Sequence, residues 1–326
     1  MDLVFRYGCI LIIAIMVICQ PLQAAELGRS SDSSPRQRPY ASTRLIGHIE
    51  SDQLVECSGM DVSKRAAGDL VWAINDGGNG PFVYALGLDG RDRGRVRILG
   101  IGNRDWEGMD TFVWQGRSMI LIADFGDNDR QYDSHSIFVI EEPRVNAERL
   151  SPSVVAEVAW RVDFRYPDGP HDAEGVAVDI TTGEILVLTK RDVPPLLFTV
   201  PLQPTNAQVP VTAQLVARMN RIPPPTEEDR RHPYGDFRSQ PTAMDLSTDG
   251  RLLVVLTYKH AYQFSRSSGK SWSAAVNKRP ILIRLPLPQN SRNLHQREAI
   301  CFTGDERSLL VTSEGLGSGI FQINIR

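Results

Sequence analysis

Five short segments of the sequence place an oxygen-bearing side chain in one local pattern. In each segment this residue precedes a Gly or Ala and then an apolar residue, and the segments recur at intervals of about 50 to 70 residues. The five residues are Ser58, Glu107, Glu174, Thr242 and Glu298. If they converge in a poorly solvated place, their like charges favour protonation, and a bound cation resolves the conflict. A set of oxygen ligands without His or Cys suits Ca²⁺ and argues against zinc or copper.

A second interpretation of the same residues needs no metal. The Glu and Ser side chains can hydrogen-bond backbone amides and join neighbouring strands to one another. The Gly or Ala that follows each of them fits both interpretations, because both require the strands to approach closely. The sequence leaves the two interpretations open.

The elements that must position these residues are β-strands. Each segment is followed by an apolar run that ends in a polar residue, and then by further runs rich in Val, Ile, Phe and Tyr. Gly, Asp and Pro separate the runs at hairpin spacing, which is typical of strands. Five such units predict an all-β, five-bladed β-propeller over residues 41–326, with the five oxygen-bearing residues around its central channel. Six blades is the alternative.

The ring of blades needs a strand from the N-terminal end of the domain. The first four units each have a fourth strand, and the fifth unit runs out of chain after its third. The fourth strands are expected at Arg95 to Ile101, Val154 to Phe164, Gln214 to Met219 and Ile281 to Leu285. The strand expected at Thr43 to Ile49 belongs to no other blade. Pairing it with the last unit removes an exposed edge.

Polar residues close the second strand of each unit, on the face where the first strands begin. We expect them to surround one mouth of the channel, where acids, bases and a metal would meet. Candidate catalytic bases are Asp76, Asp124 and His171. Candidate ligand-binding residues are Lys190, Arg191, Tyr258, Lys259, Arg297 and Glu314. Cations beside a metal suit a small anionic ligand, because they offset its charge.

Two long loops are expected near this mouth. The loop from Gly126 to Ser136 is rich in Asp but lacks the full spacing of an EF-hand. The loop from Arg221 to Gln240 contains three consecutive prolines and is long for a connection within a compact domain. The sequence does not say whether it forms a lid.

The order Ser, Glu, Glu, hydroxyl, Glu over five inner strands resembles the calcium-activated nucleotidases, or soluble apyrases. This resemblance implies a five-bladed propeller with one Ca²⁺ in its tunnel, held at the positions of Ser58, Glu107, Glu174, Thr242 and Glu298. At Thr242 that family has Ser, which keeps the hydroxyl. Beyond these motifs, stretches such as Ile-Asn-Asp-Gly-Gly-Asn look closer to secreted bacterial propellers of unassigned function, including those labelled phytase-like.

Three functional hypotheses follow. The first is a calcium-dependent hydrolase, for example a phosphohydrolase, that acts on a phosphorylated or otherwise anionic small molecule. The second is a glycosidase that uses paired carboxylates, which would not be available if Glu107 and Glu174 bind a metal. The third is a non-catalytic propeller that binds a ligand or partner at the cell envelope. The fold itself does not choose among them.

The N-terminus predicts export. Arg6 precedes an apolar run from Cys9 to Cys19, and small residues follow at Ala24 and Ala25. This is the layout of a signal peptide over residues 1–25, with an uncleaved anchor as the alternative. Residues 26–40 are expected to be a disordered leader. We therefore expect a periplasmic or extracellular protein without a transmembrane segment in the mature chain, and a monomer.

The net charge and the cysteine content bear on nucleic-acid binding and on disulfide formation. The formal net charge of −3 gives no argument for nucleic-acid binding. After cleavage of the signal peptide only Cys57 and Cys301 remain. They lie beside the first and last inner strands, and export permits a disulfide between them. Two buried free thiols are the alternative.

Overall fold

The computed structural model describes residues 40–65, 69–145, 150, 154–206, 209–285 and 296–326. The predicted signal peptide and nearly all of the predicted leader lie outside these residues. Tyr40, the last residue of that leader, belongs to the folded part. Its side chain is buried, and its backbone forms a bridge with Ile325. Tyr40 therefore packs with the propeller domain.

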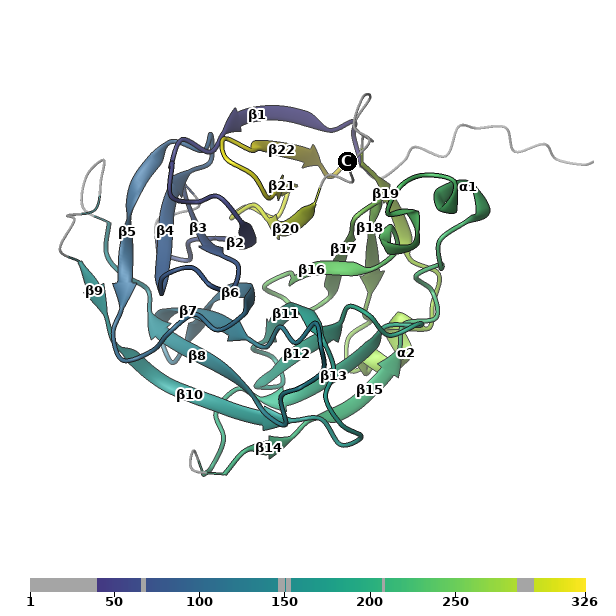
Figure 1. Ribbon diagram of the computed structural model, residues 1–326, viewed down its shortest axis with the longest axis horizontal. Helices are drawn as coiled ribbons and strands as arrows, with labels where there is room; N and C mark the ends of the chain where they lie inside the picture. Colours follow the sequence, from purple (N-terminus) through teal and green to yellow (C-terminus); the bar gives the residue numbers. More distant parts are fainter. Residues whose placement is uncertain (1–39, 66–68, 146–149, 151–153, 207–208, 286–295) are drawn as a thin grey trace, which may run out of the picture. The chain divides into compact units, whose positions relative to one another are not determined.

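Five antiparallel sheets surround a central axis (Figure 1). The first sheet contains β2 (Cys57–Val62), β3 (Leu70–Asn75), β4 (Phe82–Gly87) and β5 (Asp92–Ile98). The second contains β6 (Trp106–Trp114), β7 (Arg117–Asp124), β8 (His135–Glu141) and β10 (Val158–Arg165). The third contains β11 (Ala173–Asp179), β12 (Glu184–Thr189), β13 (Leu196–Pro201) and β15 (Gln214–Arg218). The fourth contains β16 (Pro241–Leu246), β17 (Leu252–Thr257), β18 (His260–Ser265) and β19 (Ile281–Arg284).

The N-terminal strand closes the fifth blade. This blade contains β20 (Arg297–Phe302), β21 (Ser308–Ser313) and β22 (Gly319–Asn324), and β1 (Arg44–His48) pairs antiparallel with β22. The predictions of five blades and of closure by Thr43 to Ile49 are confirmed. The inner strands pack in a closed circle, in the order β2, β6, β11, β16 and β20.

A few short elements add to the five blades. Strands β9 (Val155–Ala156) and β14 (Val211–Thr212) each extend a blade in parallel, next to β5 and β10 respectively. The helical elements are α1 (Glu227–Arg230), a 3₁₀ turn η1 (Gly235–Phe237) and α2 (Trp272–Val276). None of the helices in the described ranges is long and apolar enough to span a membrane.

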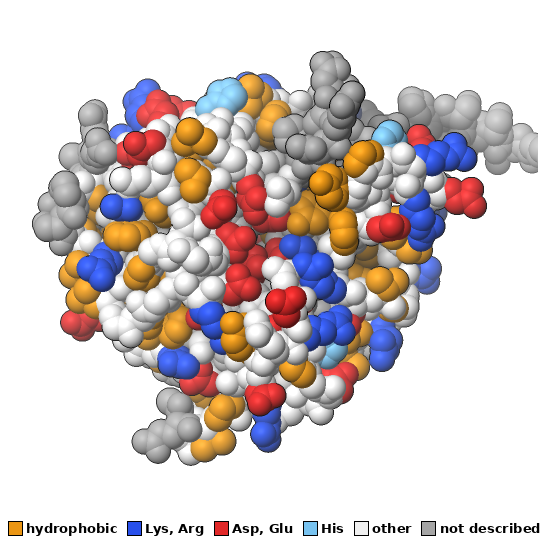
Figure 2. Space-filling model, in the orientation of Figure 1, with side chains coloured by type: hydrophobic (Ala, Val, Ile, Leu, Met, Phe, Trp, Pro, Cys, Tyr) orange, Lys and Arg blue, Asp and Glu red, His pale blue; other side chains and the backbone are white. Residues whose placement is uncertain are grey.

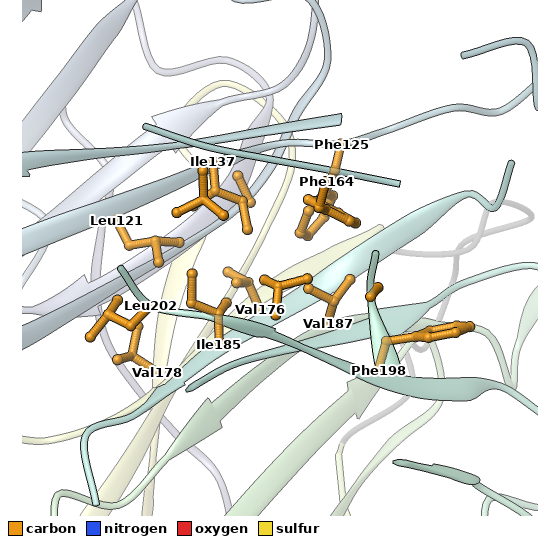
Figure 3. Close-up of a cluster of buried hydrophobic side chains, with 14 of the residues drawn as sticks. Leu121, Phe125, Ile137, Phe164, Val176, Val178, Ile185, Val187, Phe198 and Leu202 are labelled. Atoms are coloured by element: carbon orange, nitrogen blue, oxygen red, sulfur yellow. The ribbon is translucent and has the colours of Figure 1, made fainter. Parts of the chain in front are cut away.

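Apolar side chains fill the space between adjacent blades. Figure 3 shows the contact between the second and third blades, where Leu121 and Ile137 face Val176 and Ile185. Phe198 lies in the same cluster and is fully buried. Such dry interfaces hold the inner strands in a fixed relation, so the side chains that line the axis are positioned by the packing of the blades.

Cys57 and Cys301 are both free and buried. The disulfide expected between them is therefore absent. Both side chains belong to the apolar cluster between the first and fifth blades. There they behave as small buried hydrophobic residues.

Candidate functional site

Each of the five oxygen-bearing residues lies at a β-bulge in an inner strand. In β2, Cys57 pairs with Asn75 and Gly59 with Ile74, so Ser58 is the extra residue. The same irregularity recurs in the other four inner strands. All five side chains are buried. A bulge re-aims one side chain without breaking the sheet, and its repetition makes Ser58, Glu107, Glu174, Thr242 and Glu298 equivalent around the axis.

The two hydroxyl residues of this ring join neighbouring blades. Ser58 Oγ donates a hydrogen bond of 2.8 Å to the carbonyl oxygen of Trp106 in the next inner strand. Thr242 Oγ1 donates one of 2.6 Å to the carbonyl oxygen of Arg297. Both hydroxyl protons are used between neighbouring strands, and the oxygen lone pairs that a cation would bind are not, so these bonds are compatible with both interpretations.

The three glutamates of the ring have different partners. Glu174 forms an ion pair with Lys190, and Glu298 accepts a hydrogen bond of 2.8 Å from the Tyr258 hydroxyl. Glu107 is 3% exposed and has no hydrogen-bond or ion-pair partner among the described residues. Burial, and then the charge of neighbouring carboxylates, raises the pKa of Glu107 well above its usual range. Burial likewise raises the pKa of Glu174, against the ammonium of Lys190.

Glu107 gathers with two aspartates at the mouth of the channel. Asp76 follows β3, and Asp105 precedes β6. One carboxylate oxygen from each of Asp76, Asp105 and Glu107 lies within 4.8 Å of the other two. We call these three residues the acidic trio. Burial and nearby carboxylates raise the pKa values of Asp76 and Asp105 to about 6. The ring glutamates Glu107, Glu174 and Glu298 do not form such a mutually close group in the described part of the chain.

Two glycines leave the space that the acidic trio occupies. A β-carbon on Gly126 would lie 2.7 Å from Glu107 Oε1 and would also collide with Asp105 Oδ2. A β-carbon on Gly77 would collide with Asp105 Oδ1. Neither glycine has a left-handed backbone. Glycine is therefore required at both positions because it has no β-carbon, which leaves room for the three carboxylates. Acidic side chains gather on this face where the inner strands meet, and basic side chains lie beside them (Figure 2).

The predicted catalytic bases have different surroundings. Asp76 is part of the acidic trio. Asp124 accepts a hydrogen bond of 2.8 Å from the backbone N–H of Asp105, and it therefore positions a member of the trio. His171 is buried, and its ring nitrogens lie 2.9 Å from Asp192 and 3.0 Å from Asp168. These hydrogen bonds raise the pKa of His171. With both nitrogens occupied, it has none left to serve as a base.

Some of the predicted ligand-binding residues are held by partners within the protein. Arg191 pairs with Asp172 at 2.8 Å. The guanidinium of Arg297 donates to the carbonyl oxygen of Tyr258 at 3.1 Å. Burial, and then the hydrogen bond with the adjacent carboxyl of Glu298, raise the pKa of Glu314 to about 10.

The loop of residues 221–240 lies beside the mouth and is held in place by hydrogen bonds. Asp229, at the start of α1, is 2% exposed and accepts hydrogen bonds from Lys259 Nζ at 2.7 and 2.9 Å. Arg238 and the capping residue Thr226 bind the same carboxylate. These bonds hold the pKa of Asp229 far below its usual range. Lys259, predicted to bind a ligand, therefore fastens this loop.

A cavity of about 380 Å³ opens beside this loop. No member of the acidic trio lines it, but Lys190 in its wall interacts electrostatically with all three carboxylates. Its lining combines basic, aromatic and amide side chains, namely Lys190, Arg191, Tyr234, Phe237, Gln240, Tyr258 and Gln296. The predictions of Lys190, Arg191 and Tyr258 as mouth residues agree with this lining. The sequence reasoning did not single out Phe237, Gln240 or Gln296.

A second group of buried acids was missed. Asp61, Asp110 and Asp245 lie three residues after Ser58, Glu107 and Thr242, and one oxygen of each lies within 4.8 Å of the others. Each accepts a backbone N–H from the next blade, with Asp110 bonded to Val178 at 2.5 Å. These residues connect the blades by hydrogen bonds. The signal was present in the motif itself, which ends in Asp in three of the five segments.

Comparisons with known proteins found similar solved structures but no family. No protein-family model and no curated protein matches the chain. Similar solved structures include a luciferin-regenerating enzyme, at 9% identity and a TM-score of 0.43, over 87% of this chain and 95% of that one. They also include the β-propeller domain of Cps50 (Swd1) from Myceliophteria thermophila, at 14% identity and a TM-score of 0.35, over 82% of this chain and 72% of that one.

The nidogen/laminin complex is similar as well, at 14% identity and a TM-score of 0.41, over 80% of this chain and 73% of that chain. At such identities the likeness concerns the fold alone. The chain is a five-bladed β-propeller. The comparisons lend no support to the narrower resemblance to the calcium-activated nucleotidases or to the phytase-like proteins.

Proposed function

We propose that this protein is a secreted, calcium-dependent hydrolase that binds a small anionic molecule at one mouth of its propeller. The acidic trio holds the calcium ion, and the cavity beside it holds the ligand. The glutamates Glu174 and Glu298 stay with their internal partners Lys190 and Tyr258. The proposal thus keeps the calcium ion predicted from the sequence but moves its ligands from the ring to the mouth.

The observation that carries the proposal is the unpartnered carboxylate of Glu107. A buried carboxylate without a partner is costly, and proteins normally pair such a group or use it to bind a metal. Asp76 and Asp105 bring two more hard oxygen donors to the same point. Gly77 and Gly126 keep that point free of side-chain carbon. Calcium accepts irregular sets of oxygens and fills its remaining positions with water or ligand.

The arrangement can support hydrolysis of an anionic ester. A calcium ion supplies electrostatic activation of water and of the ester oxygens. Arg191 lies in the cavity wall with its side chain 33% exposed, and because its Nε pairs with Asp172, a ligand would bind the outer guanidinium nitrogens. Without an ion, burial and neighbouring charge raise the pKa values of Asp76 and Asp105 to about 6, and a bound cation would instead hold both carboxylates deprotonated. Glu107 lies deepest and is the anchor of the site.

One observation favours a second candidate function, that of a non-catalytic propeller that binds an anionic ligand or partner. His171 is the only histidine among the predicted bases, and both of its nitrogens are occupied by Asp168 and Asp192. A site without a free histidine can still retain a ligand through calcium and Arg191. Activity measurements separate the two functions, because both require the calcium ion but only one releases a product.

Calorimetric titration of Ca²⁺ into chelator-treated protein tests the site. We expect one ion per chain, and at least tenfold weaker binding in Glu107→Gln, which removes the charge and keeps the shape. Glu227→Gln, at an exposed position on α1, is the matched control. Release of p-nitrophenol from p-nitrophenyl phosphate should require Ca²⁺. Absence of Ca²⁺ binding overturns the proposal, whereas binding without hydrolysis of any ester leaves the second candidate.

A further inference from the structure

The cavity beside the loop of residues 221–240 has two chemically different walls. Lys190 and Arg191 form a basic wall, and Lys190 also reaches the ring carboxylate of Glu174. Tyr234, Phe237 and Tyr258 form an aromatic wall. The volume of about 380 Å³ is within the range of small-molecule sites. A ligand that satisfies both walls carries an anionic group and an apolar group.

Two of the aromatic side chains are unusually exposed. Tyr234 is 59% exposed and Phe237 is 40% exposed. Tyr258, by contrast, is buried and bonded to Glu298. Tyr234 and Phe237 therefore leave apolar ring surface in contact with water at the rim of the cavity. This surface is available to a ligand, and covering it is favourable.

The backbone fixes these rings at the rim. Tyr234 has a φ of 59°, a left-handed conformation that is rare for a bulky residue and persists only where the surroundings impose it. At the following position, a β-carbon on Gly235 would collide with the carbonyl oxygen of Asp229. Asp229 is in turn fastened by Lys259. The aromatic wall is thus pre-formed by hydrogen bonds and close backbone contact, which lowers the cost of ordering it on binding.

From this juxtaposition we propose that the cavity selects anionic ligands that carry a planar aromatic ring. The ring stacks against Tyr234 and Phe237, and the anionic group points toward Arg191 and the acidic trio. Offset or edge-to-face contacts between aromatic rings contribute beyond the area that they bury. The inference rests on the proposed function in one respect, because the anionic group reaches the calcium ion. The aromatic selectivity itself does not depend on that ion.

Binding of three simple phosphate esters to the full-length protein tests this inference. Phenyl phosphate, cyclohexyl phosphate and methyl phosphate are compared by calorimetry, each with Ca²⁺ and with chelator. We expect phenyl phosphate to bind at least tenfold more tightly than methyl phosphate, and also more tightly than cyclohexyl phosphate, in both conditions. Equal affinity for phenyl and cyclohexyl phosphate would overturn the preference for a planar ring.

Variants of the aromatic wall make the test specific. Phe237→Leu and Tyr234→Leu should each weaken phenyl phosphate severalfold while leaving methyl phosphate unchanged, and Phe237→Tyr should retain the preference. Leu282→Ala, at an exposed site on the outer strand β19, is the control. If Ca²⁺ binds but phenyl phosphate has no advantage, the inference fails and the proposed function stands. If the advantage persists and no Ca²⁺ binds, the proposed function fails and the inference stands.

Discussion

The ammonium of Lys190 forms an ion pair with Glu174 inside the channel, where the two side chains are only 10% and 1% exposed. Lys190 also lies 5.5 Å from the centre of the Tyr258 ring. The charges of Glu174, Glu298 and Glu107 together raise the pKa of Lys190 well above its usual range, against its burial. The protein therefore carries its own cation among the ring carboxylates.

Removing that internal cation should destabilise the protein strongly. Lys190→Met leaves the carboxylate of Glu174 buried without a partner, which typically costs about 3–5 kcal/mol. We expect the free energy of unfolding of Lys190→Met, measured by urea denaturation in the presence of chelator, to be lower than that of the wild type by this amount. Lys278→Met, at an exposed position, is the control. Ca²⁺ should restore more stability to Lys190→Met than to the wild type. A loss no larger than that of the control would contradict this role of Lys190.

The space at Gly126 gives a second prediction. Gly126→Ala places a β-carbon against Glu107 Oε1 and Asp105 Oδ2, so the acidic trio must move apart. We expect Ca²⁺ affinity to fall at least tenfold by calorimetry while the circular dichroism spectrum is preserved. Gly102→Ala is the matched control, since a β-carbon there meets nothing within 4 Å and Gly102 has no left-handed backbone. Unchanged Ca²⁺ binding in Gly126→Ala would exclude the trio as the metal site.

The ion pairs of Asp229 with Lys259 and Arg238 predict a local effect on the stability of the loop of residues 221–240. Asp229→Asn removes the charge that binds Lys259 and Arg238, so residues 226–240 should open more often while the five blades stay folded. Hydrogen exchange of this segment should become faster, with little change elsewhere. Glu228→Gln, exposed on the same helix, is the control. Faster exchange spread evenly over all blades would show that Asp229 stabilises the whole fold instead.

The pairing of β1 with β22 leads to a prediction about how the solubility of the protein depends on closure of the fifth blade. Deleting residues 41–50 exposes the hydrogen-bonding edge of β22, and an open edge is a template for association. We expect aggregation by light scattering. A chain that begins at Arg38 keeps Tyr40 and β1 and should remain monomeric. A monomeric deletion variant with an unchanged melting temperature would mean that the blade is stable with three strands.

A feature of the fold or of the site could be predicted from the sequence when it depends on residues that are close together in the chain. The ring positions of Glu107 and Glu174 were predictable, because one motif repeats in every inner strand. The inward position of Asp110 was not, because residues three apart in a regular strand face opposite sides. The bulge at Glu107 shifts this alternation, and a bulge leaves no clear mark in the sequence.

Side-chain contacts between segments far apart in the chain could not be predicted from the sequence either. Lys190 follows a strand and was expected above the ring, whereas its long side chain extends to Glu174 within it. Asp229 lies in a proline-rich loop, and its partner Lys259 comes from a different hairpin. Nothing local to either residue indicates that contact. Only the packing of the blades brings such partners together.

The buried aspartates that connect the blades predict a specific pH dependence of stability. Burial and the charge of Asp61 raise the pKa of Asp245 from 3.8 to about 8. A group whose pKa is higher in the folded state holds its proton more tightly there, so its contribution to stability is complete below about pH 4 and is lost as the pH rises through about 8. Asp110 shifts in the same direction.

The free energy of unfolding should therefore fall from about pH 4 to about pH 8, and between pH 6 and pH 8 Asp245→Asn should make that fall smaller by on the order of 2 kcal/mol. The amide cannot reproduce both hydrogen bonds that Asp245 accepts from Leu246 and Phe302, so the variant should also be less stable at pH 6. The slope with pH, and not the stability at one pH, is the measurement that tests the shifted pKa. Asp52→Asn, at an exposed turn, should keep the wild-type slope. Parallel curves for Asp245→Asn and the wild type would show that Asp245 is ionised throughout and connects the blades as a charged acceptor.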